Sequence, residues 1–129
     1  MIKQALNKLQ AKRSRGAQAE QRARQFLERA GLSFVAANIS GGGGEIDLIM
    51  REQTTLVFVE VRLRGNQRFA SASESVTHSK QRKLMQAAQY YLQREKLTDK
   101  VPCRFDVVAL QTLDSEQQPE WIKNAFGAA

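Results

Sequence analysis

The sequence predicts a mixed α/β fold in which one β-sheet is flanked by helices. Two stretches, 17–30 and 77–97, repeat apolar residues with helical spacing. Five others, 32–39, 45–50, 55–64, 99–110 and 120–126, have the composition or alternation of strands. The expected order is therefore α-β-β-β-α-β-β. The short polar stretch 51–54 predicts an antiparallel hairpin, and the helix after the third strand predicts a parallel, right-handed return.

The two helical patterns each define one apolar face. In the first helix this face is Ala19, Ala23, Phe26, Leu27 and Ala30, with Gly31 ending the helix. In the second it is Leu84, Ala87, Ala88, Tyr91 and Leu92, with Thr77 or Ser79 as the N-cap. Residues 1–15 carry five cations and no acid, so we expect a basic flexible arm there and a single domain over 16–129. This arm could follow a phosphate backbone, or it could be a solvated tail that binds nothing.

Composition and charge suggest a class of partner. The 129 residues are 42% hydrophobic and 26% charged, which is typical of a globular chain. A net charge of +7 favours a polyanion, most commonly nucleic acid. The lone Cys103 fits a reducing compartment. From the composition we expect neither a signal peptide nor a membrane span. We therefore expect a cytoplasmic protein that does not enter a membrane.

Residues 41–44 form a run of four glycines before the second strand. Such a run allows either close approach of a ligand or a plain connector, and the sequence does not separate the two. The GxxxxGK pattern is missing, which argues against a nucleoside triphosphate site.

Acidic residues occur within two predicted strands whose other residues are mostly apolar, as in buried strands. If the hairpin turn centres between residues 53 and 54, paired residues have numbers that sum to 107. Asp47 then lies opposite Glu60, and Glu45 lies opposite Arg62, with the polar set on one face of the sheet. Two facing carboxylates repel each other, and a divalent cation would offset that repulsion. The alternative is a structural ladder of ion pairs between these acids and Arg62.

Four stretches in this order, GEIDLI, FVEVR, SVTHSKQRKLMQAAQYYL and RFDVV, closely resemble the YraN-like family of small bacterial proteins. That family is similar to the PD-(D/E)XK nuclease superfamily, and in plan to archaeal Holliday-junction resolvases. The resemblance implies a restriction-endonuclease-like three-layer sandwich. It also implies a Mg²⁺ or Mn²⁺ site made of Glu20, Asp47, Glu60 and the carbonyl of Val61.

The resemblance further implies roles for the residues around this site. Asp47, Glu60 and Arg62 are the expected catalytic residues, and the substrate-binding set is Arg62, Arg64, Lys80 and Gln81. Arg62 stands where the motif has lysine. Arginine stays protonated, so it can clamp a phosphate but cannot act as a base.

For two further residues the sequence predicts a structural position and no catalytic role. Asp106 is expected to form an ion pair with Arg104 or Arg64, and His78, the only histidine, to lie solvated at a helix start.

Three functions remain open from the sequence. The first is a Mg²⁺-dependent endonuclease acting on DNA, including branched or damaged forms. The second is a nucleic-acid-binding module without catalysis, which Arg62 favours. The third is a protein-interaction scaffold whose acids pair with arginines. The oligomeric state stays open, with a homodimer as one option.

Overall fold

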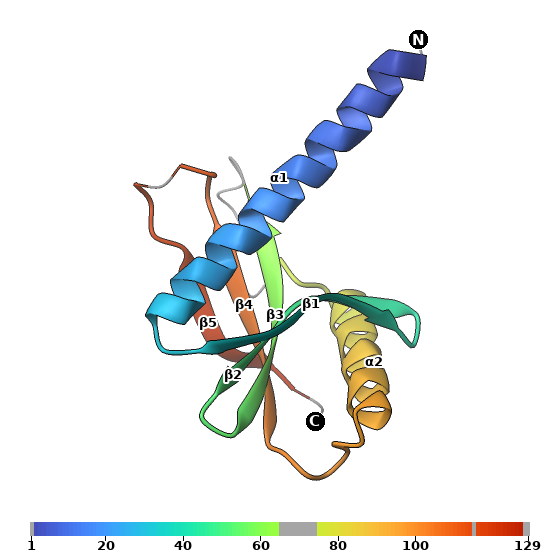
Figure 1. The fold of residues 1–129 in the computed structure, drawn as a ribbon, viewed down its shortest axis with the longest axis vertical. Coiled ribbons are helices and arrows are strands. Elements are labelled where there is room, and N and C mark those ends of the chain that lie inside the picture. The colour runs from blue at the N-terminus through green and yellow to red at the C-terminus, as the bar shows by residue number, and fades with distance from the viewer. Residues whose placement is uncertain (1, 65–74, 115, 128–129) are drawn as a thin grey trace.

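The computed structural model describes residues 2–64, 75–114 and 116–127, without the side chains of residues 6–14. Its elements are α1 (Ile2–Arg29), β1 (Ser33–Gly41), β2 (Gly44–Glu52), β3 (Thr55–Leu63), α2 (His78–Arg94), β4 (Cys103–Leu110) and β5 (Glu120–Phe126). The predicted mixed α/β class and element order are confirmed (Figure 1). Among these residues no helix is long and apolar enough to span a membrane.

The five strands form one mixed sheet in the order β1-β2-β3-β4-β5. The β2–β3 hairpin is antiparallel and pairs Leu48 with Val59 and Glu52 with Thr55, which is the predicted register. Its turn places Gln53 at φ 54°. Strand β4 returns parallel to β3 after α2, as expected for a helical crossover, and β5 pairs antiparallel with β4.

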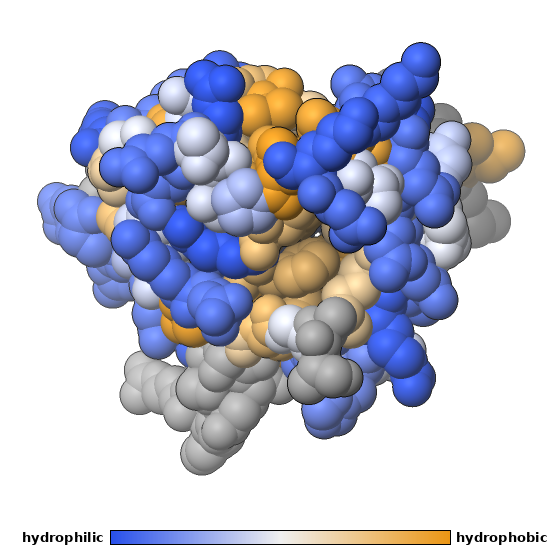
Figure 2. Space-filling view, turned by 90° about the horizontal axis from the view of Figure 1, so that it is seen from below, coloured by the Kyte–Doolittle hydropathy of each residue, from blue (hydrophilic) through white to orange (hydrophobic). Residues whose placement is uncertain are grey.

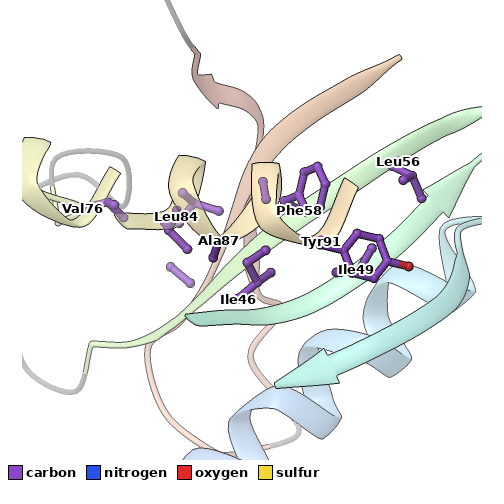
Figure 3. Packing of buried hydrophobic residues seen from close by; sticks show 11 residues of the cluster. Ile46, Ile49, Leu56, Phe58, Val76, Leu84, Ala87 and Tyr91 are labelled. Carbon is purple, nitrogen blue, oxygen red and sulfur yellow. The ribbon is translucent and has the colours of Figure 1, made fainter. Parts of the chain in front are cut away.

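The two helices bury different faces of the sheet. On β3, Phe58 belongs to the apolar cluster beneath α2, whereas Val57 and Val59 belong to the cluster beneath α1. Alternation along a strand sends neighbouring side chains to opposite faces, so the helices cover opposite faces. Figure 3 shows the α2 cluster, in which Leu84, Ala87 and Tyr91 of the helix face the strands.

Helix α2 lies mainly over β1 and β2. On the same face of the sheet, the end formed by β4 and β5 is less covered. Phe105 and Phe126 stack there with ring centroids 5.1 Å apart, and both remain partly exposed. Seen from below, the molecule has apolar surface in a hollow between hydrophilic side chains (Figure 2). The sheet is therefore asymmetrically covered on this face.

Helix α1 begins at Ile2, not near residue 17 as the pattern predicted. Figure 1 shows its N-terminal part projecting beyond the sheet. The physical reason is that residues 2–15 are mostly good helix formers, which apolar periodicity alone does not detect. The basic segment thus continues the helix of the domain, while its flexibility stays a prediction. Ala30, expected on the buried face, is exposed.

The glycine run packs against helix α2. A Cβ on Gly44 would lie 2.2 Å from the carbonyl oxygen of Lys83, and one on Gly41 would lie 2.1 Å from Cδ1 of Tyr90. Gly42 and Gly43 have positive φ and make the turn between β1 and β2. The glycine run therefore allows α2 to pack closely against the turn between β1 and β2.

We predict that Gly44→Ala destabilises the fold by about 1–3 kcal/mol, because the methyl group meets helix backbone that cannot move aside. Urea unfolding followed through the single tryptophan, Trp121, measures this loss. Gly127→Ala is the control, since an added Cβ there has no atom within 4 Å. Equal stability of both variants and the wild type would contradict the packing role.

Candidate functional site

Asp47 lies where the β2–β3 hydrogen-bond ladder stops. Regular pairing of the hairpin reaches Leu48 and Val59. Beyond it, the backbone N–H of Val61 donates to Oδ2 of Asp47 over 2.9 Å, so the carboxylate replaces a strand carbonyl. This contact holds the carboxylate at the edge of β3.

The side-chain alternation of β2 also breaks at this position. Regular strand alternation would place Ile46 and Leu48 on the same face, but they belong to opposite apolar clusters. On β1 the flanking pairs Ala37–Leu48 and Ile39–Ile46 place Asn38 opposite Asp47, and Asn38 has φ 54°. Asparagine tolerates this left-handed conformation better than most residues.

Glu60 is buried on the α2 face of β3 with only 3% of its surface exposed. Its Oε1 lies 3.6 Å from Nζ of Lys80 and 3.9 Å from Nη1 of Arg62. Its Oε2 is buried and receives no hydrogen bond from the described residues. A buried carboxylate oxygen without a donor is costly, and it points to a missing proton or cation.

Burial raises the pKa of all three acids that the resemblance assigned to a metal. Loss of solvation, followed by the charge of Asp47, raises the pKa of Glu60 to about 7. Loss of solvation likewise raises the pKa of Asp47, although the Val61 N–H opposes this. Protonated Glu60 can donate to Asp47, so the two carboxyl groups share one proton below about pH 7.

The donor set fits a hard divalent cation at two carboxylates. Asp47 and Glu60 offer oxygen ligands, which Mg²⁺ and Mn²⁺ prefer, and Oε2 of Glu60 has no other partner among the described residues. No group of three or more acid, histidine or cysteine side chains that could hold a metal is formed within that part of the chain. Glu20 is instead hydrogen-bonded to Asn38, and the charge of Asp47 helps to raise the pKa of Glu20 after burial.

Lys80 is the cation that interacts with both buried acids. Its charge lowers the pKa of Asp47 and of Glu60, and on Glu60 it acts more strongly than Arg62. Lys80 comes from the first turn of α2, where Thr77 accepts from its backbone N–H. The sequence placed Lys80 among substrate-binding residues and gave the central role to Arg62, but the structure puts Lys80 closer to Glu60.

The other sequence-based candidates lie in different surroundings. Gln81 donates to the carbonyl of Val76 at the start of α2. Arg64 lies 3.9 Å from Glu120. Glu45 pairs with Ser40 of β1. On its other side, the β2–β3 ladder ends at Leu48 and Val59, so the expected pair of Glu45 with Arg62 is not formed in the register. The hairpin ladder ends before either residue because Asp47 interrupts it.

Asp106 forms the predicted ion pair with Arg104 at 3.0 Å and is fully buried. It also accepts from the indole of Trp121 and the N–H of Asn124, both at 2.9 Å. These contacts give Asp106 a structural role. His78 is exposed at the first residue of α2, as expected.

Asn38 is the site residue that sequence reasoning missed. Its signal was weak, because an asparagine three residues before a glycine run usually indicates only a turn. A hollow of about 400 Å³ lies between α1 and Leu113, away from the acids of the site. None of the clustered acids lines it, so size alone does not locate the site.

We predict that the stability of the wild type falls as the pH rises from ~4.3, the usual glutamate pKa, through about 7. The folded state binds the Glu60 proton more tightly than the unfolded chain, so ionisation favours unfolding. Glu60→Gln should flatten this slope and be more stable than the wild type at pH ~8 by roughly 1–3 kcal/mol.

Urea unfolding between pH ~5 and ~8 measures this slope, with the exposed Glu116→Gln as the matched control. An unchanged slope in Glu60→Gln would contradict the raised pKa of Glu60.

Comparison with known proteins identifies the relatives of this chain. It is 52% identical over 109 residues to a UPF0102 protein of Enterobacter sp. strain 638, covering 84% of this chain and 80% of that protein. It is 51% identical over 115 residues to one of Pectobacterium carotovorum, covering 88% and 94%. It is 54% identical over 108 residues to UPF0102 protein YraN of Escherichia coli O139:H28, covering 83% and 79%. Residues 19–110 match the model of the uncharacterised protein family UPF0102, and the chain belongs to this YraN-like family.

Proposed function

We propose that this protein is a metal-dependent endonuclease-like protein that acts on DNA, with Asp47 and Glu60 at its centre. The observation that carries the proposal is the buried Oε2 of Glu60. It lies beside a second buried carboxylate and has no hydrogen-bond donor among the residues that the structure describes. A structural ion pair would satisfy both oxygens, as Asp106 shows elsewhere in the sheet. The restriction-endonuclease-like arrangement of the sheet is part of the same proposal.

The carboxylates would hold a Mg²⁺ or Mn²⁺ ion, with waters and phosphate oxygens as further ligands. Bound there, the ion would supply charge neutralisation and an activated water for phosphodiester hydrolysis. The proton that Asp47 and Glu60 share would leave when the cation binds, so affinity should increase with pH. The carbonyl of Val61 is proposed as an additional ligand, on the resemblance alone. Glu20, which the resemblance also implied, is hydrogen-bonded to Asn38 and is not assigned to the metal.

Lys80 and Arg62 would contact the phosphate from the α2 side of the sheet. Both lie within 4 Å of the same oxygen of Glu60, Lys80 at 3.6 Å and Arg62 at 3.9 Å. Once a cation occupies the carboxylates, these side chains are free to turn to an anionic substrate. Lys80 supplies a compact charge, whereas Arg62 can donate two parallel hydrogen bonds.

A nucleic-acid-binding module without catalysis is the second candidate. Two observations favour it: Arg62 takes the place of the motif lysine, and the described acids form no three-ligand metal group. Binding and cleavage must therefore be measured separately.

We predict that Asp47→Asn abolishes Mn²⁺-dependent cleavage of branched and single-stranded DNA. Lys80→Met should lower cleavage by about tenfold or more, as expected for loss of a charge at the transition state. Lys100→Met removes the same charge from an exposed position after α2 and is the matched control.

Binding is measured in parallel with Ca²⁺ in place of Mn²⁺. Cleavage that survives Asp47→Asn would refute the proposed centre. Binding without cleavage by the wild type would establish the second candidate.

We also predict that DNA binding weakens steeply between ~50 and ~200 mM salt, because binding releases counterions from phosphates. A chain lacking residues 1–15 should bind every DNA sequence more weakly and with a smaller salt slope, since five cations are lost. Fluorescence anisotropy at several salt concentrations measures both effects. Failure of the wild type to bind duplex, single-stranded or branched DNA at low salt would rule out the proposed substrate class.

A further inference from the structure

A cavity of about 170 Å³ lies between α1 and the β1–β2 strands, next to the proposed site. Its lining combines four polar side chains with an apolar floor and is made of Ala17, Glu20, Gln21, Arg24, Phe34, Ala37, Asn38 and Leu48. Small-molecule sites have this mixture of apolar surface and a few converging polar groups. The cavity has room for several waters or one small ring.

One wall of this cavity is a stacked pair of planar groups. The guanidinium carbon of Arg24 lies 3.7 Å from the ring centroid of Phe34, and Nε of Arg24 lies 3.4 Å from Glu28. The ion pair and the ring together hold the guanidinium over the aromatic face. Arginine planes and aromatic rings are the surfaces on which unpaired nucleobases stack.

The polar rim of the cavity is rich in hydrogen-bond acceptors. Glu20 accepts from the side chain of Asn38, and the carbonyl oxygen of the Asn38 amide adds a further acceptor. Gln21 lies beside them on α1 and can donate or accept. A carboxylate in this position selects a partner that carries N–H donors, such as the exocyclic amine of cytosine.

The cavity adjoins the proposed centre through the β1–β2 pair. Asn38 lies opposite Asp47 in the ladder, and the charge of Asp47 acts directly on Glu20. We infer that this cavity receives one unpaired, amino-bearing nucleobase from the strand whose phosphate lies at Asp47 and Glu60. The inference rests on the proposed function and adds the substrate class, because a base can present its pairing edge to Glu20 only outside a duplex.

The test compares oligomers of about 12 nucleotides that share a phosphate backbone but differ in their bases. The probes are oligo-dC, oligo-dT and a fully abasic oligomer. Their binding is measured by fluorescence anisotropy in Ca²⁺, whose contribution to phosphate binding is the same for all three. The wild type should bind oligo-dC about tenfold more tightly than the abasic oligomer, since one stacked base supplies that difference. It should also prefer oligo-dC to oligo-dT.

Three variants separate the parts of the site. Ala17→Trp fills the cavity from an exposed position and should reduce oligo-dC binding to the abasic level. Gln25→Trp adds the same side chain at an exposed position of α1 outside this cavity and should bind like the wild type. Glu20→Gln should remove the preference for oligo-dC over oligo-dT. Asn38→Gly keeps the positive φ, deletes the amide and should weaken the same preference.

The outcomes distinguish this inference from the function on which it rests. Equal wild-type affinity for oligo-dC and the abasic oligomer overturns the base site while leaving phosphate binding intact. An oligo-dC advantage that survives Ala17→Trp also overturns it. Failure to bind any oligomer, abasic included, overturns the proposed function and this inference together.

Discussion

The hydrogen bond from the Val61 N–H to the Asp47 carboxylate organises the site. It ends the β2–β3 ladder with a side chain in place of a backbone carbonyl. A buried backbone N–H must find an acceptor, so the strand edge is satisfied only while Asp47 stays there. The same bond holds the carboxylate beside Glu60. Burial raises the pKa of both acids, and the charge of Asp47 raises the pKa of Glu60 further. The proposed metal site and the proton between the two acids both depend on this position.

Packing on both faces of the sheet keeps these charges out of water. Glu60 lies among the apolar side chains under α2, and the glycine turn fixes that helix by backbone contact. The first turn of α2 then brings Lys80 to within 3.6 Å of Glu60. This cation reduces the repulsion between the acids without satisfying both oxygens of Glu60. Two buried carboxylates that are not fully paired lower the stability of the fold. A role for Asp47 and Glu60 in binding a ligand therefore explains them better than a ladder of ion pairs does.

The sequence predicted the elements of the fold because each has a local cause. Alternation defined β2 and β3, the polar stretch 51–54 placed the turn, and Thr77 capped α2 as expected. The break at Asp47 could not be predicted, because strict alternation assumes a regular strand. Because of this break, Ile46 and Leu48 lie on opposite faces of the sheet, and the β2–β3 ladder ends before Glu45 and Arg62. The proximity of Lys80 also needed three-dimensional information, since 20 residues of sequence separate it from Glu60.

The most direct measurement is a crystal of the protein soaked in Mn²⁺ at pH ~8, where Glu60 is mainly ionised. Anomalous density should appear between Asp47 and Glu60, within about 2.0–2.6 Å of Oε2 of Glu60. An Asp47→Asn crystal soaked in the same way should lack that density. If the wild type shows no anomalous density and its Asp47 and Glu60 carboxylates remain hydrogen-bonded to each other, the acids form a structural pair and the account of a metal centre is wrong.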